Sequence, residues 1–550
     1  MSIVNMLGKM IHARAPHRRG PRHDPSRGGR LSVELLETRC LLSGDVILQW
    51  NAVALDGVKG DYALGHTPDQ GGPTRDSRAL AIVHAAMFDA VNSIDGHFTP
   101  YLTVAPNAKG ASLEAAVAQA AHDTLVQLYP SQTATFDAAL SSTLAAVPNG
   151  QAENKGISVG RYVAAAILAA RAADGSNATS DYHTIGKPGH HQPAPLHQNQ
   201  GFLTTEWGQV TPFAVPSVTP LLSPPPSALD SAEYTAAYAE VAALGGDGVT
   251  TPTVRTAEQT QIGIFWGYDG SPGLGTPPRM YNQITRIVAD QQHNNVYDNA
   301  RLFALVNIAM ADGGIQAWDV KYVYDFWRPV IAIRAANTDG NPLTTRDADW
   351  TPLGAPRSND PGGTNFTPPF PAYTSGHATF GAAMFRTLAD FYGRDDITFS
   401  FNSDEFNGVT KDQDGSVRPV VTRTFPSFSA AAEENGQSRI YLGIHWSFDK
   451  VKGVQAGNAV ADYVVANLLR PKGHGATHLS AAQGVAATAH PVLAHELGHV
   501  LGHDHKEHGV MAEALAAGQR HLPRPSLGAV DSALLDWALA QGKIPRVGLR

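Results

Sequence analysis

Three separate segments of the chain carry residue types that can bind and protonate an oxyanion. The first, residues 321–329, reads Lys-Tyr-Val-Tyr-Asp-Phe-Trp-Arg-Pro and places Lys321 seven residues before Arg328. On a continuous helix this spacing puts both side chains on one face, about 10.5 Å apart along the axis. Pro329 disfavours helix at Arg328, so we expect the guanidinium near a helix end. Two such cations can hold a tetrahedral anion, although a solvated helix face is the commoner reason for this spacing.

The second segment, residues 370–381, reads Phe-Pro-Ala-Tyr-Thr-Ser-Gly-His-Ala-Thr-Phe-Gly. A Pro-rich loop here leads into an Ala-rich helix, with Ser375 as the expected N-cap. The N–H groups of a first helical turn are free to bind an anion. Gly376 lets the backbone approach that anion closely, and His377 would stand beside it, placed for proton transfer. The alternative is an ordinary capped helix.

The third segment, residues 438–449, reads Ser-Arg-Ile-Tyr-Leu-Gly-Ile-His-Trp-Ser-Phe-Asp. Arg439 and His445 are six residues apart and cannot share a helix face. We therefore expect Gly443 to end the helix and turn the chain back toward one centre. Asp449 could accept the outer N–H of the His445 ring and fix its tautomer. A surface arginine and a core histidine are the alternative interpretation.

A fourth motif, at residues 495–505, contains residue types that bind zinc. It reads His-Glu-Leu-Gly-His-Val-Leu-Gly-His-Asp-His, and its candidate ligands are His495, His499 and His505, with Glu496 placed to activate a metal-bound water. The pattern resembles the metzincin proteases. About 25 residues between the last predicted helix and this motif are too few for a protease sheet and cleft. The motif therefore indicates a zinc-binding module or a remnant of one, rather than a protease.

The elements that must position these residues are predicted to be helices. Apolar residues recur at helical spacing in Ala-rich stretches, whereas alternating strand patterns are scarce. The linkers 175–228 and 340–374 are long and rich in Pro and Gly. The sequence thus predicts an all-α protein with extended loops. The predicted helices cover residues 77–94, 113–128, 132–146, 156–173, 229–244, 281–293, 299–326, 376–392, 427–442 and 450–469.

Composition limits the classes of protein to consider. The 550 residues are 43% hydrophobic and 16% charged, with a net charge of −8, which argues against a general nucleic-acid binder. A single cysteine, Cys40, excludes an intrachain disulfide. No run of about 18 apolar residues occurs, so no membrane span is expected.

The chain is predicted to have three parts. Residues 1–44 hold eight Lys and Arg against three acidic residues and end in a Leu-Glu-x-Arg-x-Leu-Leu-Ser sequence. This segment resembles the leaders of planctomycete surface and exported proteins, so we expect an exported or cell-surface protein. A disordered basic tail is the alternative. Residues 45–470 form the predicted main domain, and a change in composition after Leu469 marks residues 471–550 as a C-terminal appendage.

Taken in order, Lys-x6-Arg-Pro, Ser-Gly-His and Ser-Arg-x5-His resemble the signature of the type-2 phosphatidic acid phosphatase and vanadium haloperoxidase superfamily. The residues that flank each segment are similar to those of the vanadium chloroperoxidase branch. One example is Trp-Asp-Val-Lys, which leads into the first segment. The resemblance is strong over about 300–460 and looser over 46–300. One residue departs from the pattern: family members usually have Pro before Ser-Gly-His, where this chain has Thr374. That departure puts the stiffness of the loop in doubt.

The resemblance implies a fold of two four-helix bundles with the site at the mouth of one bundle. It also implies a role for each matching residue. His445 matches the axial ligand to vanadium, and His377 matches the acid–base residue. The family's cations, which offset the charge on the equatorial oxygens of vanadate, have their counterparts in Lys321, Arg328 and Arg439. The family's hydrogen-bond donors to the same oxygens have theirs in Ser375 and the Gly376 N–H. Trp318 and Phe370 match apolar residues on the halide side, with core packing as the alternative.

The implied activity is that of a vanadate-dependent haloperoxidase. Vanadate would act as a Lewis acid, so that hydrogen peroxide oxidises a halide to hypohalous acid, which halogenates small organic acceptors. The same residues could instead hydrolyse phosphomonoesters, with His445 as nucleophile and His377 as leaving-group acid. A zinc metalloprotease and a catalytically silent surface protein are the remaining alternatives.

Overall fold

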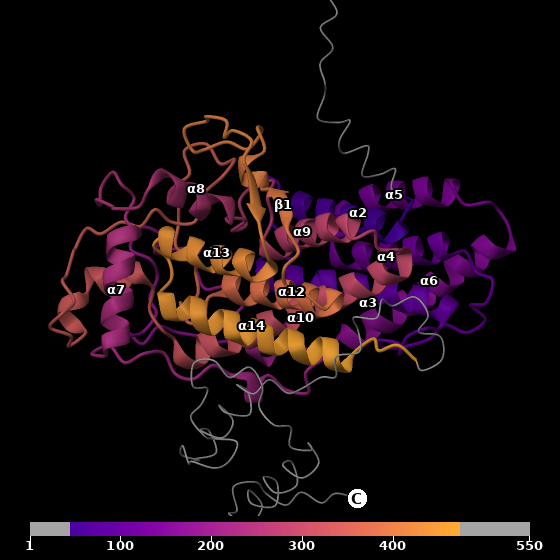
Figure 1. Cartoon of the computed structure of the whole chain (residues 1–550), viewed down its shortest axis with the longest axis horizontal. Coiled ribbons are helices and arrows are strands. Elements are labelled where there is room, and N and C mark those ends of the chain that lie inside the picture. Colours follow the sequence, from indigo (N-terminus) through magenta and orange to yellow (C-terminus); the bar gives the residue numbers. More distant parts are fainter. Residues whose placement is uncertain (1–43, 473–550) are drawn as a thin grey trace, which may run out of the picture. The chain divides into compact units, whose positions relative to one another are not determined.

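The structure, a computed structural model, describes residues 44–472 (Figure 1). The chain divides between Gln483 and Gly484 into two units, and every described residue belongs to the first. Apart from Gly44, the predicted leader lies outside the described residues. So does the predicted appendage apart from Pro471 and Lys472, and with it the zinc motif.

The described residues are mostly helical, which confirms the predicted all-α fold class; the number of four-helix bundles stays a prediction. The N-terminal helices are α2 (Val46–Asp61), α3 (Pro73–Asp95), α4 (Leu113–Leu128), α5 (Thr133–Ala145) and α6 (Gln151–Arg171). The middle of the chain contributes α7 (Ala232–Leu244), α8 (Ala257–Phe265), α9 (Pro277–Gln291), α10 (Val296–Tyr324) and α11 (Pro329–Arg334). The last helices are α12 (Gly376–Tyr392), α13 (Phe428–Tyr441) and α14 (Ser447–Asn467).

All ten predicted helices are present, and three further helices were missed. Helix α2 contains several β-branched residues and two glycines, Gly57 and Gly60, all of lower helix propensity, so its signal was weak. Asp45 starts this helix by accepting hydrogen bonds from Ile47 N and Leu48 N. A short hairpin of β1 (Phe399–Asn402) and β2 (Thr422–Phe425), paired antiparallel with Phe399 opposite Phe425, was missed too.

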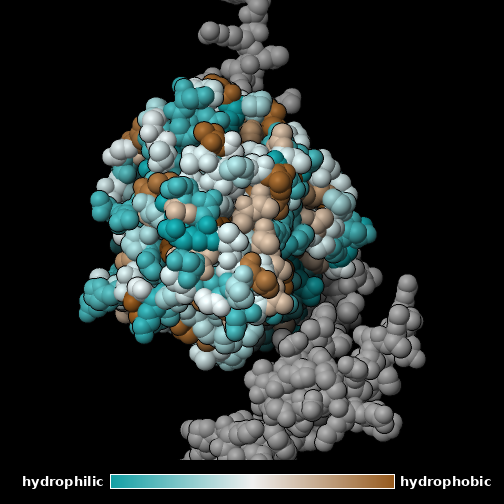
Figure 2. Space-filling view, turned by 90° about the vertical axis from the view of Figure 1, so that its left-hand side faces the viewer, coloured by the Kyte–Doolittle hydropathy of each residue, from teal (hydrophilic) through white to brown (hydrophobic). Residues whose placement is uncertain are grey.

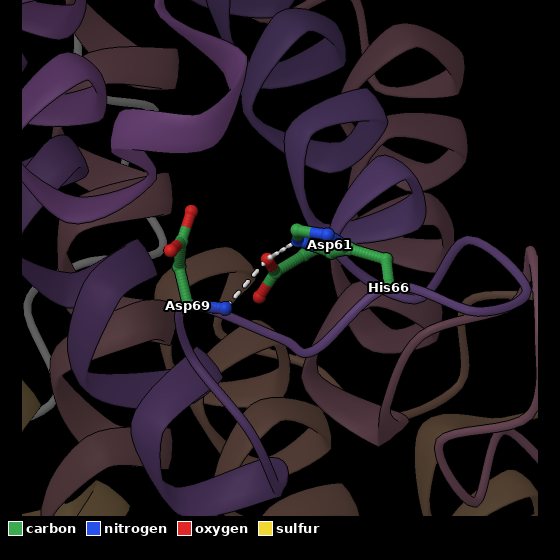
Figure 3. Close-up of side chains that lie close together, drawn as sticks. All are labelled: Asp61, His66 and Asp69. Carbon is green, nitrogen blue, oxygen red and sulfur yellow. Dashed lines mark hydrogen bonds and ion pairs between the residues drawn. The ribbon is translucent and has the colours of Figure 1, made fainter.

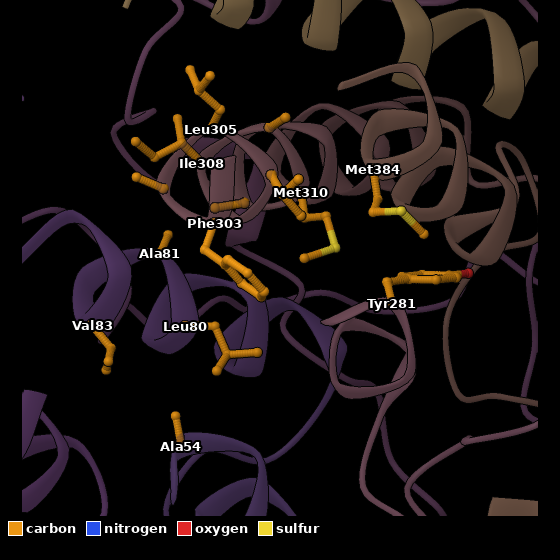
Figure 4. Packing of buried hydrophobic residues seen from close by; sticks show 14 of the residues in the cluster. Ala54, Leu80, Ala81, Val83, Tyr281, Phe303, Leu305, Ile308, Met310 and Met384 are labelled. Carbon is orange, nitrogen blue, oxygen red and sulfur yellow. The ribbon is translucent and has the colours of Figure 1, made fainter. Parts of the chain in front are cut away.

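Helix α10 runs through the centre of the core. Every residue from Asn299 to Trp318 is buried, so the helix is enclosed on all sides by its neighbours. It packs against α3 and α12. Figure 4 shows Phe303 and Met310 of α10 among side chains from these neighbouring helices. The central position of α10 fixes its C-terminal turn, which carries Lys321.

Small residues bring α14 close to the start of α12. A Cβ atom at Gly453 would meet Ser375 O at 2.8 Å, and one at Gly457 would meet Thr379 O at 2.3 Å. Only glycine fits such an approach, because any larger residue would push the helices apart. The contact holds the first turn of α12 against α14, which follows the His445 segment.

The surface of the described residues is mixed in character. Figure 2 shows one face, where polar residues predominate and apolar residues are scattered among them or gathered in a narrow strip. Scattered apolar residues of this kind are usual on protein surfaces. Among residues 44–472, no helix combines the length and the apolar character needed to cross a bilayer.

Candidate active site

The fold brings the three predicted segments together around one cavity of about 210 Å³. The last turn of α10, the loop before α12 and the turn between α13 and α14 meet there. Of the predicted site residues, the cavity is lined by Trp318, Phe370, Gly376, His377, Arg439 and His445. Lys321, Arg328 and Ser375 are not among the lining residues, and of the three Arg328 donates hydrogen bonds to residues of the lining, Phe370 and His445.

The prediction that Lys321 and Arg328 share one helix face is wrong. Helix α10 ends at Tyr324, and Asp325 adopts a left-handed conformation with φ of 51°. Arg328 is the N-cap of the next helix, α11. The two cations therefore approach each other because the chain turns at Asp325, not because a helix continues.

Asp325 is a positioning residue that the sequence analysis missed. Tyr182 donates a hydrogen bond to its Oδ1 at 2.5 Å, and His190 Nδ1 lies 3.1 Å from its Oδ2. His191 N donates to its backbone oxygen at 2.7 Å. The long loop 175–228 thus fastens the turn between the two site cations. The only sequence signal was the tolerance of Asp for left-handed conformations, which identifies no partner.

Lys321 holds the loop that precedes α12. It is fully buried, and its Nζ donates to three carbonyl oxygens, those of Pro371, Ala372 and Thr374, at 2.5–3.0 Å. Burial, reinforced by the nearby charge of Arg328, holds the pKa of Lys321 well below its usual value. Lys321 therefore shapes the cavity wall through the backbone.

Arg328 connects this loop to His445. Its Nε donates to Phe370 O at 2.8 Å, and one terminal nitrogen donates to Ile444 O at 2.8 Å and to His445 Nε2 at 2.9 Å. The other terminal nitrogen, Nη2, is buried and has no hydrogen-bond partner among the described residues. Burial lowers the pKa of Arg328 to about 9, which still leaves it charged at neutral pH.

His445 is oriented by two partners, as expected from the position of Asp449. Helix α13 ends at Tyr441, and Gly443 has a φ of 72°, which turns the chain back as predicted. The ring Nδ1 lies 2.8 Å from Asp449 Oδ2. Because Arg328 can only donate, Nε2 must accept and Nδ1 must carry the proton. Burial, then the nearby cations, hold the pKa of His445 well below its usual value, so the ring is neutral.

His377 lies in the first turn of α12 after the predicted N-cap, Ser375. The Ser375 side chain accepts from Ala378 N at 3.4 Å. His377 Nε2 lies 2.8 Å from Gly267 O and 3.1 Å from Trp266 O. Carbonyl oxygens only accept, so Nε2 carries the proton. Burial, then the charge of Arg439, lowers the pKa of His377 to about 4. A bound anion would raise that pKa by stabilising the charged ring.

Asp269 is a second residue that the sequence analysis missed. Its carboxylate pairs with Arg439 through two contacts of 2.6 and 3.1 Å and lies 4.0 Å from His377 Nε2. The two residues are 170 positions apart, and no motif or spacing connects them. Arg439 Nε remains buried and unpartnered among the described residues. One N–H of this guanidinium is therefore free for another acceptor.

The charges around the cavity favour an anion. Lys321, Arg328 and Arg439 carry three positive charges, whereas Asp269 and Asp449 carry at most two negative ones. Burial raises the pKa of Asp449 to about 7, which reduces that compensation further. Together with the two unpartnered guanidinium N–H groups, this arrangement fits a tetrahedral oxyanion. Vanadate is such an oxyanion, and the buried Nε2 of His445, a residue of the cavity lining, could serve as a nitrogen ligand to a vanadium centre.

Trp318 and Phe370 form an apolar wall of the same cavity. Their ring centroids lie 4.8 Å apart. The Phe370 ring also lies 5.0 Å from Lys321 Nζ and 4.9 Å from the Arg328 guanidinium carbon. An apolar wall backed by cations can hold a weakly hydrated anion, and the cation–π contacts keep the ring in place.

Comparison with known proteins agrees with this geometry. The family model of the vanadium chloroperoxidase N-terminal domain matches residues 42–200, and that of its second helical-bundle domain matches residues 301–471. The chain belongs to the vanadium chloroperoxidase family. Vanadium chloroperoxidase from Curvularia inaequalis is 41% identical to it over 277 residues, a match that covers 43% of this chain and 44% of the relative. The chain thus matches less than half the length of this curated member of the family.

Solved structures of vanadium haloperoxidases share the fold. The first bacterial vanadium-dependent iodoperoxidase superimposes with a TM-score of 0.63 at 24% identity, covering 78% of this chain and 98% of its own. A holo-type bacterial vanadium-dependent chloroperoxidase gives 0.57 at 16% identity, covering 73% and 93%. At these identities the likeness establishes the fold, and the chemistry rests on the site.

Proposed function

We propose that this protein is a vanadate-dependent haloperoxidase, which oxidises halide with hydrogen peroxide to hypohalous acid. The observation that carries the proposal is the single cavity in which His377, Arg439 and His445 converge with an excess of buried positive charge. The identity to vanadium chloroperoxidase supports it, although that match covers only part of each protein.

Each side chain has a role that follows from its hydrogen bonds. His445 Nε2 would become the protein nitrogen bound to vanadium. Arg328 Nη1 would then give up its hydrogen bond to His445 and, together with the unpartnered Nη2, would donate to the anion. The neutral His377 ring would take up and return a proton at the edge of the anion. When bound, vanadate supplies a Lewis-acid centre that activates hydrogen peroxide toward a halide.

The second candidate, phosphomonoester hydrolysis, uses the same donors, because phosphate is also a tetrahedral oxyanion. There His445 Nε2 would attack phosphorus, and His377 would protonate the leaving group. Residues that merely hold an anion cannot separate the two activities, so both must be assayed on one preparation.

The test uses the purified full chain, with and without added orthovanadate. We expect peroxide-dependent oxidation of bromide or iodide only after vanadate is added, and loss of this activity in His445→Ala. The same preparation without vanadate is assayed against a generic phosphomonoester. Hydrolysis there, with no halide oxidation under any condition, would replace the proposed function with the phosphatase.

We also propose that Trp318 and Phe370 face the halide. Both line the cavity, and Phe370 lies against the two buried cations. Exchanging Phe370→His should change the ratio of the initial rates with chloride, bromide and iodide while vanadate affinity changes little. An unchanged ratio would assign the two rings to core packing alone.

For the C-terminal motif we propose zinc binding without proteolysis. The proposal rests on the sequence spacing of His495, His499 and His505, which lie outside the described residues. A variant with His495→Ala and His499→Ala should bind one zinc fewer than the unmodified chain and keep its haloperoxidase activity. Casein cleavage that a chelator abolishes would show that the motif is a protease after all.

A further inference from the structure

A second group of charged side chains lies at the turn between α2 and α3, outside the oxyanion site. Asp61 ends α2, and His66 and Asp69 follow on the connecting loop (Figure 3). One potential ligand atom from each residue lies within 4.8 Å of the other two. The Asp61 side chain is fully buried, whereas 33% of the His66 side chain is exposed, so an ion could reach the group from solvent.

The distance between His66 and Asp61 suits two ligands of one metal ion better than a hydrogen bond. His66 Nε2 lies 3.4 Å from Asp61 Oδ1, longer than the usual range of about 2.7–3.2 Å for N–H···O bonds. A tetrahedral ion with ligands at about 2.0–2.1 Å separates those ligands by about 3.3–3.4 Å. Ser131 Oγ lies 3.5 Å from the same nitrogen and 2.6 Å from Asp69 Oδ2, and thus offers a fourth donor.

The local charge also calls for a cation. Within residues 44–472, no Lys or Arg forms an ion pair with Asp61 or Asp69, so one imidazole is the only basic partner of two carboxylates. The Asp61 oxygens each accept one backbone N–H, from Asp69 and Gln70, at 2.8 Å. Each oxygen keeps a second lone pair.

We propose that Asp61, His66 and Asp69 bind one divalent transition-metal ion of the zinc class. One imidazole nitrogen with two carboxylates suits Zn²⁺ or Mn²⁺ better than Ca²⁺, which prefers six or more oxygens. The Ser131 hydroxyl or a water would complete the coordination.

The position of this site suggests what the ion does. The loop that carries His66 and Asp69 is flanked by Tyr62 and Gly72, and both of these line the oxyanion cavity. Gly72 N donates to the Tyr62 hydroxyl at 2.6 Å, which ties the two ends of the loop together. An ion bound to the loop would brace one wall of the active-site cavity. The ion site itself does not depend on the proposed haloperoxidase activity.

The test uses Co²⁺, whose visible absorption reports tetrahedral coordination, on the chelator-stripped full chain. The chain carries His495→Ala and His499→Ala, so that the C-terminal motif does not contribute. We expect one equivalent of bound cobalt with a visible band, and loss of both in His66→Ala. Asp69→Asn keeps an acceptor for Ser131 and removes one charge, so it should weaken cobalt binding at least tenfold without unfolding the loop.

His97→Ala is the matched control. His97 is a more exposed histidine that also pairs with a carboxylate, that of Asp95, but within residues 44–472 it belongs to no group of three potential ligands. This variant should bind cobalt like the unsubstituted background. The proposal is overturned if the background binds no cobalt, or if His66→Ala and Asp69→Asn retain its stoichiometry and absorption. Thermal unfolding of each variant shows that lost binding is not lost folding.

Discussion

At the scale of single residues, the chemistry of the cavity depends on which side of each ring or guanidinium is already hydrogen-bonded. His445 donates through Nδ1 to Asp449, and its other nitrogen faces the cavity beside Arg328. Arg328 and Arg439 each keep one buried nitrogen without a partner among the described residues. We expect an oxyanion to bind at these unpartnered nitrogens, because the other nitrogens of Arg328 and Arg439 already donate to protein acceptors.

The carboxylate of Asp449 should control the reactivity of His445. Asp449→Asn keeps the shape of the side chain but removes the charge that stabilises the His445 ring when it binds a cationic centre. We expect vanadate affinity and bromide oxidation to fall by about 10–100-fold. Asp462→Asn, on the same helix but paired with Arg386 at the surface, is the control and should leave both quantities unchanged. Equal behaviour of the two variants would remove Asp449 from the site.

Asp269 should supply the counter-charge of Arg439 when no anion is bound. Its side chain is 6% exposed and that of Arg439 is 1% exposed, so Asp269→Asn leaves a buried cation without its partner. We expect the free energy of unfolding in urea to fall by about 3 kcal/mol. Saturating vanadate should recover part of that loss, because the oxyanion supplies a new partner for Arg439. A loss of the same size with and without vanadate would show that the anion does not reach Arg439.

At the scale of secondary-structure elements, the site is assembled where helices end. α10 ends at Tyr324, Ser375 caps the start of α12, and the turn after α13 carries His445. Sequence periodicity located these helices and ended the one that carries Lys321 at residue 326, yet it could not show the left-handed turn at Asp325 that brings Arg328 toward Lys321. The turn depends on Tyr182 and His190 from a distant loop, and helical spacing carries no information about such partners.

This dependence predicts different effects for two substitutions at Asp325. Asp325→Ala removes both side-chain hydrogen bonds and puts a residue that disfavours left-handed backbone at φ of 51°. It should lower the free energy of unfolding by about 2 kcal/mol and weaken vanadate binding as well. Asp325→Asn tolerates the same backbone and keeps an acceptor, so about half of that loss is expected. Equal losses in urea titrations would refute the role of the left-handed turn.

A pH-dependent contact joins two other helices. His122 of α4 lies 2.8 Å from Asp123 and 2.8 Å from Asp137 of α5, through opposite ring nitrogens. The hydrogen bond to Asp123, aided by Asp137, raises the pKa of His122 above its usual value of about 6.5. The contact therefore stabilises the fold fully below that value and is lost as the pH rises through the raised pKa.

The measurement is the urea midpoint of the unsubstituted protein minus that of His122→Gln, taken at several pH values. We expect the difference to be largest at acidic pH, where the ring is charged in both the folded and the unfolded protein. It should shrink toward alkaline pH. A difference that grows with pH would mean that the ring is neutral in the folded protein.

At the scale of the whole molecule, the fold class and the residues of the three motifs could be predicted from the sequence. Several residues and elements that position those motifs could not. Motif order and helical periodicity identified Lys321, His377 and His445. Asp269 was missed because a carboxylate in a loop carries no periodic signal, and α2 because its propensities are weak. The leader and the zinc motif lie outside the described residues, so export and zinc binding stay predictions.

Above all, we claim that the cavity holds one vanadate. Equilibrium dialysis of the full chain against orthovanadate, with vanadium quantified in the protein, measures this directly. We predict one vanadium per chain for the unsubstituted protein and His97→Ala. Binding should be at least tenfold weaker in Arg439→Ala and His445→Gln, with circular dichroism confirming that both remain folded. Folded variants that bind vanadium as tightly as the unsubstituted chain, or an unsubstituted chain that binds none, would contradict the claim.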